Sequence, residues 1–115
     1  MQKRMRHRVY WSKPWDSYRI EVIWGRVTSW PGIIPDTGEW FIWLEQVPSF
    51  HFQAKDSGHF TARKETRKRG GVYWIAYRHI DGLLVKKYIG PQAQITIARL
   101  EEIVGELERK ARPEA

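Results

Sequence analysis

Cysteine is absent from the chain, so it forms no disulfide bonds and offers no thiolate ligands to a metal. Apolar runs long enough to cross a membrane are also absent, and the basic start MQKRMRHR lacks the apolar segment that follows it in a signal peptide. No Gly-rich loop opens a helix, as a phosphate-binding loop would require. We therefore expect a cytoplasmic protein with no membrane association, no cofactor and no metal.

The 115 residues include seven Trp, five Tyr and four Phe, which is enough apolar surface for one folded core. We expect a flexible basic arm over residues 1–8, a single α+β domain over residues 9–110, and a tail over residues 111–115. Within the domain, residues 9–48 form a Trp-rich hairpin and short helix, and residues 49–110 form a four-stranded meander followed by a helix.

Positive charge is distributed unevenly along the chain, whose net charge is +7. Residues 59–95 contain eight basic and two acidic side chains, whereas residues 9–58 contain four basic and six acidic ones. A basic patch on one part of a fold is the electrostatic footprint of nucleic-acid binding, although a merely solvated basic surface is the simpler alternative.

The N-terminal half alternates strand and turn signals. We expect strands over residues 8–11 and 18–24, which form a hairpin, and a loop over residues 25–35, which contains Trp30. Thr37 is a suitable N-cap for a helix over residues 39–46. Trp40, Trp43, Leu44 and Val47 share one face of that helix, so we expect the Trp side chains to belong to the core in preference to a ligand platform.

Turn residues define a meander over residues 49–90. Asp56-Ser57-Gly58 reads as a three-residue loop with Gly58 in the left-handed conformation, and Asp81-Gly82 as a two-residue turn that pairs Ile80 with Leu83. Lys68-Arg69-Gly70-Gly71 reads as a two- or four-residue loop, and both lengths give the same side-chain parity.

This register predicts which side of the sheet is core. The core face comprises Phe50, Phe52, Phe60, Ala62, Tyr73, Ile75, Tyr77, Leu84 and Tyr88. The opposite face comprises His51, Gln53, Thr61, Arg63, Glu65, Arg67, Trp74, Ala76, Arg78, Val85 and Lys87. Thr96 caps a final helix to about Arg109, whose apolar stripe of Leu100, Ile103, Val104 and Leu107 should pack on the core face and leave the basic face open.

The run RKETRKRGGVYWIAYRHIDGLLVKKYIG followed by ITIARLEEIVGEL resembles the arm-type DNA-binding domain at the N-terminus of tyrosine recombinases and its AP2-like relatives. In that family the exposed face of a three-stranded sheet enters the major groove. The resemblance implies groove or phosphate contacts for Arg63, Arg67, Trp74, Arg78 and Lys87, with Lys68 and Arg69 at the turn. WFIWLEQVPSFHFQ and the segments after it are similar to an uncharacterised module at the N-termini of LuxR-type bacterial regulators.

Two short segments resemble the halves of the GIY-YIG nuclease motif: Gly71-Val72-Tyr73 and Tyr88-Ile89-Gly90. Arg99 falls near the position of that family's catalytic Arg. The family also needs a further strand and a metal-binding Glu on a later helix, which this sequence does not provide. The four His lack partners at metal-ligand spacing and the Ser residues lack a recognisable base, so we expect no catalytic residues.

We therefore predict an α+β fold of order β-β-α-β-β-β-β-α, an antiparallel meander sheet backed by a C-terminal helix, with an N-terminal hairpin and short helix. The predicted function is non-catalytic binding of double-stranded DNA by the basic face of the meander, in a mobile-element, phage or transcription-regulator context. The alternatives are RNA binding and a protein-interaction module that meets its partner through the Trp-rich N-terminal half.

Overall fold

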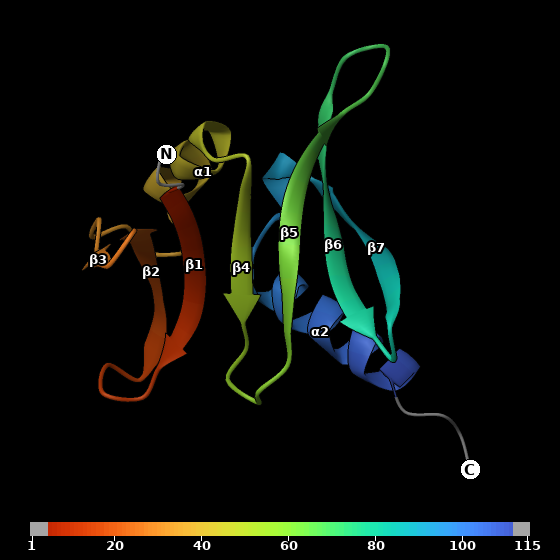
Figure 1. Ribbon diagram of the computed structural model, residues 1–115. Helices are drawn as coiled ribbons and strands as arrows, with labels where there is room; N and C mark the ends of the chain where they lie inside the picture. Colours follow the sequence, from red (N-terminus) through yellow and green to blue (C-terminus); the bar gives the residue numbers. More distant parts are fainter. Residues whose placement is uncertain (1–4, 112–115) are drawn as a thin grey trace.

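The computed structural model describes residues 5–111, which form a seven-stranded mixed sheet and two α-helices (Figure 1). The elements in chain order are β1 (Met5–Ser12), β2 (Ser17–Trp24), β3 (Val27–Ser29), α1 (Gly38–Gln46), β4 (Ser49–Gln53), β5 (His59–Thr66), β6 (Val72–Ile80), β7 (Leu83–Pro91), a 3₁₀ turn (Gln92–Gln94) and α2 (Ile97–Ala111). The α+β class, the N-terminal strands, and the meander backed by a C-terminal helix are as predicted.

The strand order is β3-β2-β1-β4-β5-β6-β7, and every neighbouring pair is antiparallel except β1 with β4. The parallel pairing is short, because only Arg8–Tyr10 face His51–Gln53. We name this junction the β1–β4 seam. It places the N-terminal strands beside the meander in one sheet (Figure 1). These strands extend the sheet sideways and do not cover either face of the meander.

Two predictions for the N-terminal half are wrong. Residues 5–8 of the predicted arm are the start of β1, where Met5 pairs with Trp24 and Arg8 with Glu21; residues 1–4 lie outside the described residues. The predicted loop over residues 25–35, with its alternative of a strand extended through Val27, begins with a separate third strand, β3, that pairs back on β2. Gly25 takes a φ of +60°, which closes a two-residue turn and pairs Trp24 with Val27.

Both helices lie on one face of the sheet, behind it in Figure 1, and the core fills the space between them. The rings of Trp40 and Trp43 contact Phe50 of β4 at centroid distances of 6.1 and 5.7 Å. The stripe of Leu100, Ile103, Val104 and Leu107 on α2 is buried as predicted. The backbone N–H of Arg99 donates to the Thr96 hydroxyl at 3.2 Å, which confirms that cap, whereas the Thr37 hydroxyl donates to the Ile34 carbonyl and caps no helical N–H.

The predicted core face is correct for β4 and β5. Phe50, Phe52, Ala54, Phe60 and Ala62 are all buried. The loop between these strands has three residues, but it is shifted by one, because the Ala54 N–H donates to the Gly58 carbonyl. Ser57, not Gly58, takes the left-handed conformation, with a φ of +69°. Because the loop still has an odd number of residues, each side chain of β4 and β5 stays on the face predicted for it.

The predicted core face is wrong for β6 and β7. Trp74 and Ala76 are fully buried against the helices, whereas Tyr73, Ile75 and Tyr77 point to the opposite side. The cause is the β5–β6 loop. The Arg67 N–H donates to the Gly71 carbonyl, which leaves three residues, Lys68–Gly70, in place of two or four. Gly70 and Gly71 have φ values of +83° and +87°, a conformation that glycine adopts without strain.

The Asp81-Gly82 turn is confirmed and carries the reversed parity into β7. Ile80 pairs with Leu83, Tyr77 with Lys86 and Ile75 with Tyr88. A bulge then shifts the register, so Trp74 faces Gly90. Ile89 lies on the helix side by the same alternation as Lys87 and is in the core, with 1% of its surface exposed, while Tyr88 lies on the other side.

Tryptophan serves the core only in part. Trp40, Trp43 and Trp74 are buried, but Trp15, Trp24 and Trp30 are exposed around β2 and β3. The expectation that the Trp side chains are core is therefore wrong for these three residues. Trp24 pairs with Val27, and Trp30 lines one pocket with Ile34, at the β3 edge of the sheet, whereas Trp15 lies in the β1–β2 turn.

Candidate nucleic-acid interface

The face of β5, β6 and β7 that points away from the helices carries basic and aromatic side chains in alternate positions. We name the following set the open-face cluster: Arg63, Glu65 and Arg67 on β5, Tyr73, Ile75 and Tyr77 on β6, and Lys86 and Tyr88 on β7. The register brings these side chains together, because Glu65 faces Tyr73 and Ile75 faces both Arg63 and Tyr88.

Glu65 organises the aromatic part of the cluster. Its carboxylate accepts hydrogen bonds from the Tyr73 hydroxyl, at 3.0 Å, and from the Tyr77 hydroxyl. These two bonds lower the pKa of Glu65 and raise the pKa values of Tyr73 and Tyr77. The carboxylate therefore stays ionised and the phenols stay neutral, with each ring held in place by its own hydroxyl.

The cations of the cluster lie over these rings. The Arg67 guanidinium is 4.9 Å from the Tyr73 ring centroid, and its Nη2 donates to the Tyr88 hydroxyl at 3.3 Å. Arg63 and Lys86 each lie 5.6 Å from the Tyr77 ring. Among the described residues, none of these three cations has a carboxylate within 4 Å. Glu65 is the one carboxylate of the cluster, and Lys86 and Arg63 contribute to the lowering of its pKa. With three cations and one carboxylate, the cluster presents a net positive charge to a partner that approaches the face.

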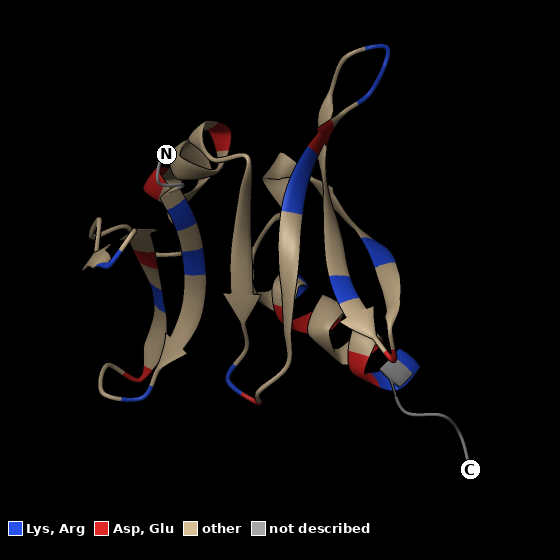
Figure 2. Cartoon of the chain, viewed as in Figure 1, with Lys and Arg blue, Asp and Glu red and all other residues tan. Residues whose placement is uncertain are grey.

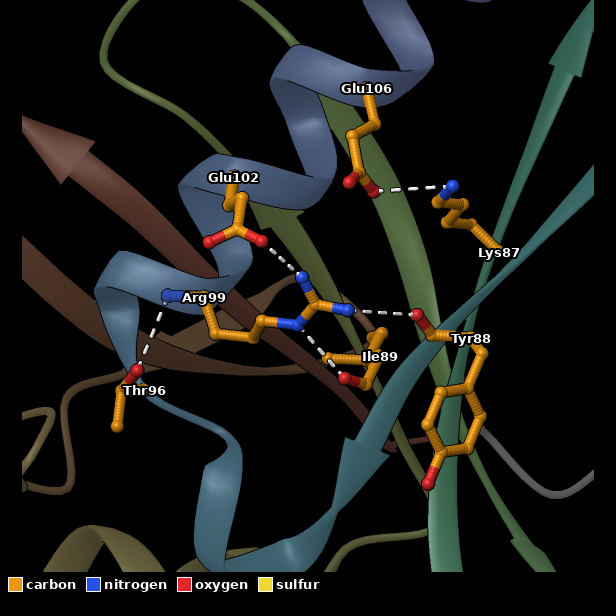
Figure 3. A network of polar contacts seen from close by, with 7 residues as sticks. All are labelled: Lys87, Tyr88, Ile89, Thr96, Arg99, Glu102 and Glu106. Carbon is orange, nitrogen blue, oxygen red and sulfur yellow. Dashed lines mark hydrogen bonds and ion pairs between the residues drawn. The ribbon is translucent and has the colours of Figure 1, made fainter.

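Basic residues on the helix side of the sheet are arranged differently. Arg78 meets Glu108 of α2 at 2.6 Å, and Lys87 meets Glu106 of α2 at 3.4 Å. Lys64 donates to the Glu45 carbonyl at 2.9 Å. Figure 3 shows the Lys87 pair beside the Arg99 network on the same helix. The α2 carboxylates thus neutralise the cations that project toward them.

This arrangement divides the residues predicted to contact DNA. Arg63 and Arg67 lie on the open face. Trp74, Arg78 and Lys87 lie on the helix-covered face, which corrects the prediction that they share a surface with Arg63. Trp74 is fully buried, and its indole N–H has no hydrogen-bond partner. One loop residue more or fewer moves a whole strand to the other face, and this is why all three were misplaced together.

Lys68 and Arg69 occupy the loop between β5 and β6, where both are exposed. Figure 1 shows this hairpin extending well beyond the ends of the neighbouring strands, and Figure 2 shows basic residues at its tip. The hairpin is a two-stranded ribbon, and the major groove of B-DNA, about 12 Å wide, admits such a ribbon.

The basic face continues across the β1–β4 seam onto the N-terminal strands. Arg8 meets Glu21 at 3.2 Å and lies 4.6 Å from the Tyr10 ring. The His51 and His59 rings are 5.3 Å apart, and burial, His59 and Arg8 together lower the pKa of His51. Strands β1, β2 and β4 therefore extend the open face, while α1 lies on the other side of the sheet.

Sequence reasoning missed Tyr73, Tyr77, Lys86 and Tyr88 as members of this face. The signal that could have found them is the Gly70-Gly71 pair. Two consecutive residues suited to positive φ favour a loop with the strand-closing bond at Gly71, as observed.

The residues that resemble the GIY-YIG motif are held in structural contacts. The Arg99 guanidinium donates to the Ile89 carbonyl at 2.9 Å and to the Tyr88 carbonyl at 3.3 Å (Figure 3). The Tyr88 ring points away from Arg99 in that view. Arg99 therefore fastens the end of β7 to α2.

Over residues 5–111, no three His, Asp or Glu side chains are grouped so that they could hold a metal ion. Within the same range, no helix has the length and apolar character needed to cross a membrane. Comparison of the chain with protein-family models, with curated proteins and with solved structures finds no match.

Proposed function

We propose that the protein binds double-stranded DNA, without catalysis, through the open-face cluster and the β5–β6 loop. The observation that carries this proposal is the separation of its cations. Those on the helix side meet Glu106, Glu108 or a backbone carbonyl, whereas Arg63, Arg67 and Lys86 have aromatic neighbours and no carboxylate within 4 Å among the described residues. A phosphate backbone supplies the missing anions.

In this proposal the projecting β5–β6 hairpin enters a groove of the duplex, and the open-face cluster contacts the adjacent phosphate backbone. Arg67, Lys68 and Arg69 lie at or next to the tip, where a guanidinium fork can reach guanine edges or phosphates. Arg63 and Lys86 lie behind the tip on the open face. The N-terminal strands, which carry Arg6 and Arg8, would then run beside the bound duplex.

The test is a duplex-binding series measured by fluorescence anisotropy between 50 and 200 mM salt. The variant Arg63→Glu/Arg67→Glu/Lys86→Glu is compared with the control Lys13→Glu/Lys55→Glu/Lys110→Glu, which changes the net charge equally. The control residues are exposed and lie in the β1–β2 turn, the β4–β5 loop and the end of α2.

At about 1 kcal/mol for each lost contact, the cluster variant should bind about 100-fold more weakly. The slope of log K against log salt should fall by about 2.7, since each neutralised phosphate contributes about 0.9. The control should stay within about threefold of the parent protein. Absence of binding at 50 mM salt, or equal losses in the two variants, would refute the proposal.

An unpaired nucleic-acid strand, RNA included, is the second candidate. The observation in its favour is the set of three tyrosine rings on the open sheet, of which Tyr88 is exposed and Tyr73 and Tyr77 are half-buried, because bases stack on accessible aromatic side chains. Tyr73→Leu/Tyr88→Leu separates the two candidates. It should weaken binding of a single strand at least about tenfold and leave duplex affinity within about threefold.

A further inference from the structure

The sheet opens next to the β1–β4 seam. Pairing of β1 with β4 begins at Arg8, while Met5–His7 continue beyond it. On the other side, Ser49 pairs with Arg63, and the Pro48 carbonyl accepts the Lys64 N–H at 3.0 Å. The strands that border this gap therefore take their backbone partners elsewhere, which leaves a cleft of about 680 Å³ between them.

The cleft is lined by cationic and neutral polar groups together with apolar ones. The residues that line it are Met5, Arg6, His7, Pro48, Ser49, Phe50, His51, Thr61, Arg63 and Lys64. No carboxylate is among them. Arg6 and Arg63 supply positive charge, and Ser49 and Thr61 supply hydroxyl donors. The Lys64 ammonium lies on the helix side, where it donates to the Glu45 carbonyl.

The surroundings of these cations strengthen the preference for an anion. The imidazole of His51, which borders the cleft, contacts the Thr61 hydroxyl at 3.4 Å, and burial, His59 and Arg8 lower its pKa. A bound anion would offset the mutual repulsion of these groups.

The size and the apolar wall narrow the class of ligand. A single phosphate fills only a small part of this volume, which lies within the range of about 300 to 1,000 Å³ for small-molecule sites. Met5 and Pro48 are exposed and offer an apolar surface next to the cations, whereas the Phe50 side chain is buried in the core. A phosphate joined to a flat, largely apolar ring system matches both parts.

We propose that this cleft binds one nucleotide unit, with its phosphate on Arg6 and Arg63 and its base against Met5 and Pro48. The unit can be a free mononucleotide or a nucleotide within a strand on the open face. Binding of a nucleotide that belongs to a strand rests on the proposed function, because Arg63 belongs both to the cleft and to the open-face cluster.

The experiment titrates dAMP, adenosine and inorganic phosphate into the full chain at low salt and follows binding by calorimetry. We expect saturable binding of dAMP with a dissociation constant below about 1 mM, and binding of adenosine and of phosphate at least about tenfold weaker. The variants Arg6→Gln and Arg6→Glu should weaken dAMP binding about tenfold or more.

Two controls separate the cleft from the duplex surface. Lys13 lies in the turn at the other end of β1, so the Lys13→Glu variant should bind dAMP with the affinity of the parent protein. Arg67→Glu alters the cluster but not the cleft, so it should lose duplex affinity while its dAMP affinity is unchanged. Thermal unfolding of each variant establishes that it is folded before titration.

A single-stranded oligonucleotide identifies the source of the nucleotide. If it displaces dAMP, the cleft accepts nucleotides of a strand; if it does not, the ligand is a free mononucleotide, and both results support the site. Failure of dAMP to saturate at about 10 mM, or equal dAMP affinity in folded Arg6→Glu and Lys13→Glu, overturns it. Loss of duplex binding alone would overturn the proposed function and leave this site intact.

Discussion

Gly58, in the β4–β5 loop, lies directly against α2. It is buried, and a Cβ placed on it would lie 2.1 Å from Cγ1 of Val104 and 3.3 Å from a carboxylate oxygen of Glu108. Carbon atoms pack best at about 3.5 to 4.0 Å, so the added methyl group of Gly58→Ala must displace the Val104 side chain by more than about 1 Å. Val104 is β-branched and helical, and its side chain has little freedom to rotate away.

Overpacking of this kind costs about 1–3 kcal/mol, and we expect Gly58→Ala to lie near the upper limit. Val104→Ala removes two methyl-sized groups, at about 0.8 kcal/mol each, and should cost about 2 kcal/mol. In the double variant the methyl group added at position 58 enters the space that the Val104 side chain has vacated. Its free energy of unfolding should therefore equal or exceed that of Val104→Ala alone, which corresponds to a coupling energy of about 3 kcal/mol.

Urea unfolding followed by Trp fluorescence measures each free energy, with the m-value as a check that the transition is unchanged. Gly38→Ala is the matched control, because nothing lies within 4 Å of its added Cβ and it occupies the first turn of α1. That control should be neutral or slightly stabilising. Additive costs for Gly58→Ala and Val104→Ala would show that the β4–β5 loop and α2 do not meet at this point.

Two other predictions concern residues whose environments the structure defines. Trp74→Ala should lower the free energy of unfolding by about 3–5 kcal/mol because the ring is fully buried, and Trp74→Phe should lower it less, since the indole N–H has no partner to lose. Urea unfolding measures both changes. If Trp74→Phe had normal stability but bound duplex DNA tenfold more weakly, the placement of Trp74 in the core would be contradicted. Burial, chiefly, raises the pKa of Tyr18 to about 12. Because its folded pKa exceeds the unfolded value of about 10, Tyr18 contributes stability that is present below pH 10 and is lost as the pH rises through 12. Tyr18→Phe should lose less stability between these pH values than the parent, although Tyr73 and Tyr77 keep part of the dependence; identical pH profiles would contradict the assignment.

Local patterns in the sequence were sufficient for the elements and for much of the pairing. The i, i+3, i+4, i+7 stripe of α2 and the Asp81-Gly82 turn each depend on a few neighbouring residues, and both are confirmed. The core positions of β4 and β5 also follow, since Phe50, Phe52 and Phe60 alternate with polar residues. These features need no information from distant parts of the chain.

The candidate site was predicted only in part because it depends on a single loop residue. The alternation of β6 does not identify its inner face, since Tyr73, Ile75 and Tyr77 are as apolar as Trp74 and Ala76. Only the length of the Lys68–Gly70 loop decides between the two faces. Likewise, the charges of Arg78 and Lys87 suggest side chains that face solvent or DNA. Their true partners, Glu108 and Glu106, become evident only when α2 is known to lie against these strands.

The β1–β4 seam has a consequence for the order of folding. Every other strand pair in the sheet joins neighbours along the chain, whereas Arg8 and His51, which pair at the seam, are 43 residues apart. Closing a loop of that length in place of one of about five residues costs about 2 kcal/mol more in chain entropy. We expect the two groups of hairpins to form first and the rate of folding to be limited by their docking along this three-residue junction.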